Sequence, residues 1–307
     1  MKRAVNCGLV KADNMKQAIL LLSFGTPRQP SDLLPYLTSI RRGKIPTERE
    51  LKVLTARYDA IGQWDNKLLQ TMGEEQKKTL TSLLAIDAMY LAYLHMPNSM
   101  EQAIESIATA GYTSILCIVT SPFYSMIGTG AYERKLHSIL RAYPDISCEI
   151  IKSWWNRPQF FEYWRSQLMA ANPLQADTAC IFSAHSVPTS TVGSYEDEVM
   201  SASNQIAKMV GLNHWYQAWQ SAAPHGEWLG PTIESVIEQA LIDGAKRIVC
   251  IPFGFVSDHV EILYDNDIIC RNIVENAGAT YERLPMPNGN TLFMEAMAKA
   301  IRERINK

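Results

Sequence analysis

A histidine at position 185 stands between an apolar run and a proline, in the segment 182–188 (FSAHSVP). Most histidines in folded domains have structural or solvent-facing roles. A histidine at the carboxyl end of a strand is different, because ligands of α/β proteins bind at that edge of the sheet. Neutral imidazole there can bind a metal or accept a proton near neutral pH. We therefore expect His185 to be catalytic.

Two carboxylates follow in the segment 254–267 (GFVSDHVEILYDND). Ser257 or Asp258 is suited to cap a helix that starts there. Glu261 and Asp265 are four residues apart, so a helix places them on one side. A solvated acidic face explains this pair as well as a metal site or a proton relay does, and the position after a strand favours the relay. Ferrous iron accepts imidazole and carboxylate ligands, so His185 and Glu261 predict a partial metal site, with Asp265 as an outer ligand.

Arginines and a tryptophan are candidates for binding a larger ligand. Arg41 and Arg42 end an expected helix, where cations offset the helix dipole. They could equally hold carboxylates in a bidentate fork, and Arg57 could join them. Trp228, in the segment WLGP, is either a core residue or an indole that stacks on a flat ligand.

Short apolar runs alternate with amphipathic stretches along the chain. The expected strands are 18–23, 88–94, 115–120, 148–153, 179–183, 215–219, 248–252 and 280–283. The expected helices include 47–61, 99–110, 159–169, 194–210 and 232–242. Strands that are apolar throughout and are each followed by a helix indicate parallel sheets covered on both faces.

A weak internal repeat suggests two four-stranded halves of one design. The strand 18–23 leads to FGTP as 179–183 leads to AHSVP, and Gly111 precedes Cys117 with the same spacing as Gly244 precedes Cys250. Because equivalent strand ends then face each other, we expect Phe24, Phe123, His185 and the residues after 252 to line a common cleft.

Composition sets further limits. The chain has 307 residues, 47% hydrophobic and 20% charged, with a net charge of -2, which is typical of packed globular domains and gives no general attraction for nucleic acid. The six cysteines form no CxxC pair, so an iron-sulfur cluster is not expected. No apolar stretch reaches the ~18 residues of a spanning helix. Nucleotide-binding and hydrolase signatures such as GxGxxG, the P-loop and GxSxG do not occur.

Taken in order, the motifs resemble those of the ferrochelatase family. The matching segments are SFGTP (23–27), IRRG (40–43), RYDAIG (57–62), SAHS (183–186), WQS (219–221), WLGP (228–231), FVSDHVE (255–261), LYDND (263–267) and PMPN (285–288). The resemblance implies an α/β protein with two Rossmann-like domains, each with a four-stranded parallel sheet flanked by helices. We place the first domain at 17–126 and the second, with His185 and Glu261, at 127–289; the helix 290–307 packs back on the first.

The resemblance also implies a mechanism and its substrates. The protein would bend a porphyrin, and His185 with Glu261 would accept the leaving protons and help to place ferrous iron. Arg41 and Arg42 would hold propionates. The compact length is similar to that of soluble Gram-positive members that metallate coproporphyrin III, with protoporphyrin IX as the alternative ring.

Three positions and one segment depart from the family pattern. Phe24 stands where relatives carry a metal-ligating tyrosine, Phe123 where they carry a histidine, and Ile269 where a carboxylate would extend the Glu261 and Asp265 stripe. The segment 63–67 (QWDNK) replaces a loop similar to GISP. These changes predict altered metal delivery, ring selectivity or rate.

Two alternatives remain open. The chain could be a non-catalytic porphyrin or haem carrier, or a chelatase for another metal or tetrapyrrole. For iron insertion into a porphyrin we expect a cytoplasmic monomer with no permanently bound cofactor, with at most peripheral membrane contact. Ferrous iron is then a substrate.

Overall fold

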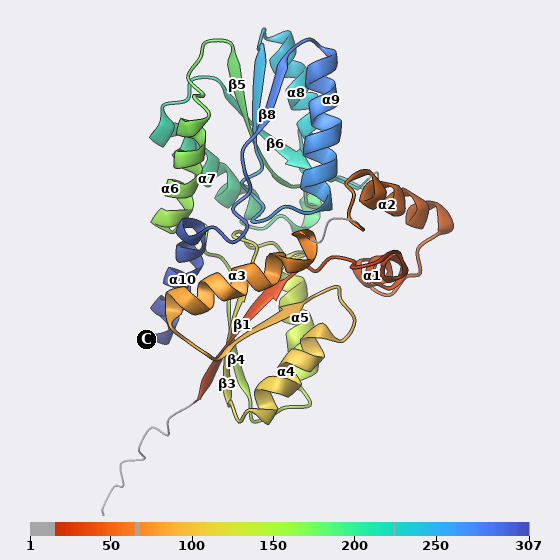
Figure 1. Cartoon of the computed structure of the whole chain (residues 1–307), viewed down its shortest axis with the longest axis vertical. Helices are drawn as coiled ribbons and strands as arrows, with labels where there is room; N and C mark the ends of the chain where they lie inside the picture. Colours follow the sequence, from red (N-terminus) through yellow and green to blue (C-terminus); the bar gives the residue numbers. More distant parts are fainter. Residues whose placement is uncertain (1–15, 65–67, 224, 307) are drawn as a thin grey trace, which may run out of the picture.

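Two parallel sheets, one in each half of the chain, form the framework of the protein (Figure 1). A computed structural model describes residues 16–64, 68–223 and 225–306. The expected α/β class with two four-stranded, all-parallel sheets is confirmed. The strands are β1 (Gln17–Ser23), β2 (Met89–Tyr93), β3 (Ser114–Val119), β4 (Ser147–Ile151), β5 (Thr178–His185), β6 (Trp215–Gln220), β7 (Arg247–Ile251) and β8 (Thr280–Arg283).

Helices cover both faces of each sheet. In the first half they are η1 (Pro30–Asp32), α1 (Leu33–Ile40), α2 (Glu48–Ala60), α3 (Leu68–Leu84), α4 (Ser99–Thr109) and α5 (Thr129–Leu140). In the second they are α6 (Pro158–Ala170), η2 (Thr189–Thr191), α7 (Tyr195–Val210), α8 (Ile233–Ile242), η3 (Glu261–Cys270), α9 (Arg271–Asn276) and α10 (Thr291–Ile305). Each of the five expected helices named above matches one of these within two residues at each end.

The strand orders are the same in the two sheets, β2-β1-β3-β4 and β6-β5-β7-β8. The internal repeat in the sequence therefore reflects a repeated topology. Gly111 and Gly244, which give the repeat its spacing, both have positive φ values, 76° and 100°, in the turns that lead into β3 and β7. Glycine is favoured there because it lacks the Cβ that makes this region costly for other residues.

The expected domain boundary after residue 126 is wrong. β4 pairs with β3, from Ser114 opposite Ser147 to Ile118 opposite Ile151, so the first sheet ends only at Ile151. A boundary at 126 would separate an edge strand from the strand that supplies its hydrogen bonds.

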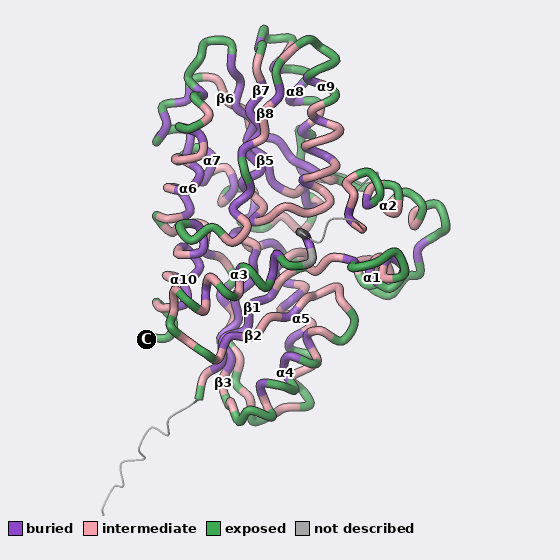
Figure 2. The backbone as a smooth tube through the Cα atoms, in the orientation of Figure 1, coloured by how far each residue is buried: buried purple, intermediate pink, exposed green. Residues whose placement is uncertain are grey.

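One hydrophobic core runs from the first sheet into the second half (Figure 2). It joins residues of β1 and β3 to residues of β5, β7 and α10. Helix α10 contacts α3 and β3 of the first half and also packs against α6. The rings of Phe123 and Phe253, which follow β3 and β7, have centroids 5.7 Å apart, so the carboxyl ends of these two strands meet.

The segment after β7 differs from the expected α-helix in its geometry. Residues Glu261–Cys270 form a π-helix, which α9 continues. Ser257 and Asp258 do not cap it: the cap position is Val260, and no side chain caps it. A π-helix is rare and is frequently found at functional sites.

Candidate active site

The ring of His185 is oriented by two neighbours. The Tyr195 hydroxyl donates to the carbonyl oxygen of His185 at 2.9 Å, which fixes the backbone at the end of β5. The Nδ1 atom of His185 is hydrogen-bonded to the carbonyl oxygen of Ser186. A carbonyl only accepts, so Nδ1 carries the proton and Nε2 is directed elsewhere.

Gly254 brings the chain after β7 against β5. Its N–H donates to the Ser183 carbonyl at 3.1 Å. A Cβ at position 254 would lie 2.4 Å from the Cβ and 2.6 Å from the Cα of Ala184, next to His185. Only glycine permits this approach, because a side chain would collide with the strand itself.

Glu261 lies between two imidazoles. Its Oε1 is 3.6 Å from Nε2 of His185, and its Oε2 is 3.5 Å from Nε2 of His259. His259 donates from Nδ1 to the Ser257 carbonyl at 3.0 Å, which points its Nε2 toward the carboxylate. The Phe255 ring packs beside both imidazoles, with centroids 6.3 Å from His185 and 4.9 Å from His259.

The charges of this group depend on one another. Burial lowers the pKa of His185, but the nearby charge of Glu261 outweighs burial, and the pKa is raised to about 9. Burial likewise favours the neutral form of Glu261, yet the His185 and His259 imidazoles hold its pKa well below the usual value. At neutral pH the pair is therefore an imidazolium and a carboxylate. The side chains of His185 and Glu261 are 37% and 28% exposed, so both can be reached by a ligand.

Asp265, the expected outer ligand, already has partners. Arg57 of α2 approaches its Oδ1 to 3.3 Å, and the Ser221 hydroxyl donates to Oδ2 at 3.0 Å. The Arg57 guanidinium also lies 5.0 Å from the centre of the Tyr264 ring. Burial raises the pKa of Asp265, and Arg57 partly opposes this effect. Arg57 therefore links the first half of the chain to η3.

Arg57 reaches η3 because of how α2 starts and ends. The Glu50 N–H donates to the Thr47 hydroxyl, and the Glu50 side chain accepts from the Thr47 N–H, which forms a capping box. Thirteen residues later α2 ends, with Arg57 in its last turn. Arg41 pairs with Glu50, and Arg42 is exposed in the turn after α1, with φ 56°.

The other candidates lie in different surroundings. Phe24 is 46% exposed, and its ring centroid is 4.4 Å from that of His95. Trp228 is half-buried and donates from its indole to the His225 carbonyl at 2.8 Å. Ile269 is half-buried in η3. Of the segment 63–67, residues 65–67 lie outside the described residues, and Gln63 is buried and donates to the Pro27 carbonyl at 3.1 Å.

The structure contradicts the expectation that Phe123 binds substrate. Its ring is 1% exposed and packs against Trp155, Phe160, Tyr195 and Phe253. It does lie at a strand end that meets the other sheet, as expected, but it points into the shared core. A ligand cannot touch a ring that the core encloses on all sides.

Sequence reasoning missed His259, Phe255 and Tyr195. His259 was visible as the histidine two residues before Glu261, and only the backbone geometry shows that its ring turns back to the same carboxylate. Among the residues that the structure describes, no three His, Cys, Asp or Glu side chains form a group that could hold a metal ion. No helix in the described ranges is long and apolar enough to cross a bilayer.

Comparisons with known proteins agree on one family. The family model described as Ferrochelatase matches residues 16–305. The coproporphyrin III ferrochelatase of Geobacillus kaustophilus is 33% identical over 302 residues, which cover 93% of this chain and 95% of the relative. The coproporphyrin III ferrochelatase of Staphylococcus aureus is 31% identical over 303 residues, which cover 94% of this chain and 98% of the relative.

Solved chelatase structures share the fold at low sequence identity. The sirohydrochlorin chelatase SirB from Bacillus subtilis, in complex with cobalt, has a TM-score of 0.60 at 10% identity and covers 94% of this chain and 95% of its own. CbiX, described as the terminal enzyme of sirohaem biosynthesis in denitrifying bacteria, has a TM-score of 0.55 at 13% identity, with 93% and 98% covered. These likenesses support the duplicated α/β fold and nothing finer.

Proposed function

Because the chain belongs to the ferrochelatase family, we propose that it inserts ferrous iron into coproporphyrin III during haem biosynthesis. The placement of Glu261 between Nε2 of His185 and Nε2 of His259, at the carboxyl end of a sheet, carries this proposal. Relatives named coproporphyrin III ferrochelatase, matched over nearly the whole chain, favour coproporphyrin III over protoporphyrin IX.

The charges of the site account for the proton transfers. Insertion of a divalent ion into a free-base porphyrin replaces two pyrrole N–H protons, so the protein must accept protons next to the ring. His185 rests as an imidazolium paired with Glu261. A divalent cation that approaches Glu261 competes with this imidazolium for the carboxylate and lowers the pKa of His185. The imidazolium then releases its Nε2 proton to solvent, and the neutral imidazole accepts one pyrrole proton at Nε2. Glu261 accepts the second pyrrole proton once the cation has left it for the ring, and both residues, which are partly exposed, return their protons to solvent.

Residues around this pair would hold the ring and its acidic side chains. Arg42 is exposed and can form a bidentate contact with a propionate, and Arg41 can do so if it exchanges its partner Glu50. Phe24 and Trp228 offer aromatic surface to a planar ligand. Arg57 would act less directly, because it is already paired with Asp265. Together these groups would supply the binding energy that supports a bent macrocycle.

The test is an anaerobic metallation assay that follows the porphyrin absorption spectrum with ferrous iron. We expect conversion of coproporphyrin III at a kcat/KM at least about tenfold above that for protoporphyrin IX, a difference of about 1.4 kcal/mol in transition-state binding. Tight binding of both rings without metallation by ferrous, cobalt or nickel ions would identify a carrier and refute the proposal. Metallation with cobalt or nickel but not with ferrous iron would identify a chelatase for another metal and refute the proposed iron insertion.

We also propose that the protein acts as a cytoplasmic monomer and holds no resident cofactor. One chain supplies His185, His259 and Glu261, so the site needs no partner subunit. The described cysteines are free, as in a reducing compartment, even though the Sγ atoms of Cys117 and Cys148 lie 3.5 Å apart. Light scattering coupled to gel filtration tests the monomer, cell fractionation tests the location, and metal analysis of the purified protein tests for bound iron.

A further inference from the structure

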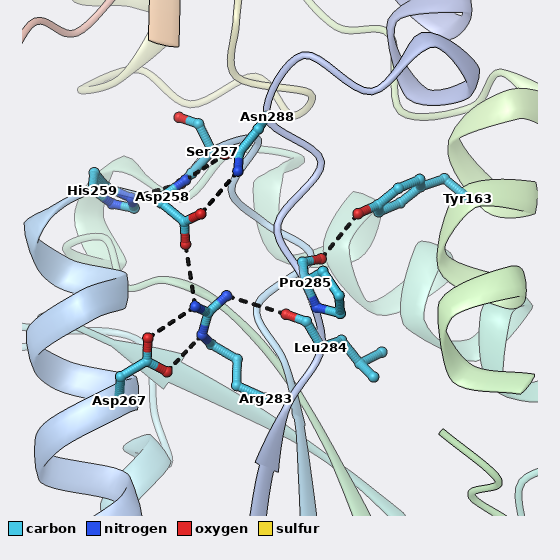
Figure 3. Close-up of polar contacts among 9 residues, drawn as sticks. All are labelled: Tyr163, Ser257, Asp258, His259, Asp267, Arg283, Leu284, Pro285 and Asn288. Carbon is cyan, nitrogen blue, oxygen red and sulfur yellow. Dashed lines mark hydrogen bonds and ion pairs between the residues drawn. The ribbon is translucent and has the colours of Figure 1, made fainter. Parts of the chain in front are cut away.

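Arg283, the last residue of β8, joins two carboxylates that flank Glu261 in the sequence (Figure 3). Its Nε and Nη2 donate to the two carboxylate oxygens of Asp267 at 2.7 and 2.8 Å. The same Nη2 lies 3.2 Å from Oδ1 of Asp258, and Nη1 donates to the Leu284 carbonyl at 3.2 Å. One guanidinium thus connects the loop before η3 to the middle of η3.

Asp258 is held from its other side by the chain between β8 and α10. The Asp258 N–H donates to Oδ1 of Asn288, and Nδ2 of Asn288 donates to Oδ2 of Asp258, both at 2.9 Å. The Asn288 N–H also donates to the Val256 carbonyl at 2.9 Å. The Tyr163 hydroxyl donates to the Pro285 carbonyl at 3.0 Å, which ties the same segment to α6.

Burial makes this clamp of Arg283, Asp258, Asp267 and Asn288 rigid. The side chains of Arg283 and Asp258 are only 14% and 12% exposed. Oδ1 of Asp258 is buried and accepts no hydrogen bond from the described residues, so the Arg283 ion pair balances it. The planar fork of arginine satisfies both carboxylates at once, which the single ammonium of lysine cannot do with the same geometry.

We propose that Arg283 is a positioning residue that sets the place of Glu261 relative to His185 and His259. Its contacts are with Asp258, Asp267 and Leu284 rather than with the reacting groups, so it acts on Glu261 through the loop before η3 and through η3 itself. A displacement of about 1 Å at a catalytic group can cost on the order of 10²-fold in rate. This inference rests on the proposed function, because its kinetic test measures the metallation of coproporphyrin III.

The experiment compares Arg283→Gln with Arg247→Gln in the full chain. Arg247 begins β7 at the opposite end of the same strand pair, is 17% exposed, and also binds a carboxylate, Glu282, and the Ala171 and Asn172 carbonyls. We expect Arg283→Gln to lower kcat for coproporphyrin III metallation by about 10- to 100-fold with KM changed less than about threefold. Arg247→Gln should stay within about threefold of wild type, and Arg283→Lys should recover part of the loss.

A second variant and a structural readout keep the test decisive. Asn288→Ala removes the reciprocal pair with Asp258 but leaves that buried carboxylate paired with Arg283, and we expect this variant also to lower kcat. Equal losses in the Arg283 and Arg247 variants, or a rise in KM alone, would overturn the inference. If the wild type metallates no porphyrin, the proposed function fails, and hydrogen exchange of residues 254–262 decides the inference: faster exchange in Arg283→Gln alone supports it, and unchanged exchange refutes it.

Discussion

The two halves of this chain place a histidine at the same edge of equivalent sheets and give it opposite properties. His95 follows β2 and packs against Phe24, and burial lowers its pKa to about 4. His185 ends β5 beside Glu261, and its pKa is raised to about 9. The two positions are not equivalent in the repeat, because β2 corresponds to β6 and β5 corresponds to β1, but both lie at the carboxyl edge of a sheet. The neighbouring carboxylate decides which imidazole carries charge. Among the described residues, the second half places a carboxylate beside its histidine at this edge, and burial alone acts on the pKa of His95.

The contrast between His95 and His185 would be refuted if replacing either histidine lowered the rate of metallation equally. We expect His185→Ala to lower kcat by about 10²- to 10⁴-fold, the usual contribution of a general acid or base. His95→Ala should lower kcat by less than about tenfold, because a neutral imidazole against Phe24 has no carboxylate partner. Anaerobic steady-state kinetics measures both, and a larger loss in the His95 variant would contradict the assignment.

Substitution of Glu261 tests whether its carboxylate causes the difference in pKa between His95 and His185. In Glu261→Gln the charge that favours the imidazolium is removed while burial remains, so the pKa of His185 should fall from about 9 to 6.5 or below. An NMR titration of the ring protons measures it. Asp265→Asn is the matched control, and the decrease should be smaller because Asp265 is the weaker influence on His185. A pKa of His185 that stays near 9 in Glu261→Gln would show that another group holds the proton.

Phe24→Tyr tests whether the first half can be given a polar role. The ring is 46% exposed, so a hydroxyl at its end can reach solvent without a clash. We expect a change in the free energy of unfolding within about 0.5 kcal/mol and a change in metallation rate below about tenfold. Denaturant unfolding and the metallation assay measure these effects. A rate increase near 100-fold would mean that the missing hydroxyl, rather than the His185 pair, limits the reaction.

The last difference between the two histidines concerns the dependence of stability on pH. Folding lowers the pKa of His95, so the stability it contributes is present above pH 6.5 and is lost as pH falls through about 4. Folding raises the pKa of His185, so its contribution is present below pH 6.5 and is lost as pH rises through about 9. His95→Asn should reduce the loss of unfolding free energy at acid pH, and His185→Asn should reduce the loss at alkaline pH. Each change should be roughly 1 kcal/mol after solvent screening. Urea unfolding at pH 5, 7 and 9 would detect either pattern, and identical pH profiles in all three proteins would refute it.

Much of the framework could be predicted because its signals are local. Apolar runs and the paired Gly111 and Gly244 spacings revealed all eight strands and the duplication, since buried parallel strands need apolar side chains on both faces. The domain boundary could not be read in the same way. β4 pairs with β3, and pairing between strands leaves no mark in the composition of the chain between them.

The site was predictable in its residue types and less so in its geometry. His185 and Glu261 were found because a strand end and a specific motif coincided, and they do lie together. The π-helix was not foreseen, because the same apolar residues fit four- and five-residue hydrogen-bonding patterns. The burial of Phe123 and the second imidazole on Glu261 depend on which way a side chain turns after its strand, and that is set by packing from distant segments.

Gly254 fixes the distance between two backbone segments, the end of β5 and the chain after β7. The chain after β7 lies directly on the backbone of β5 next to His185, so main-chain packing as well as the Arg283 clamp bears on the separation between the proton acceptor and its counter-charge. The contact between Gly254 and Ala184 leaves no room for a slightly larger residue at position 254. Even a methyl group at this position would push the two segments apart and uncouple the imidazole from its anion.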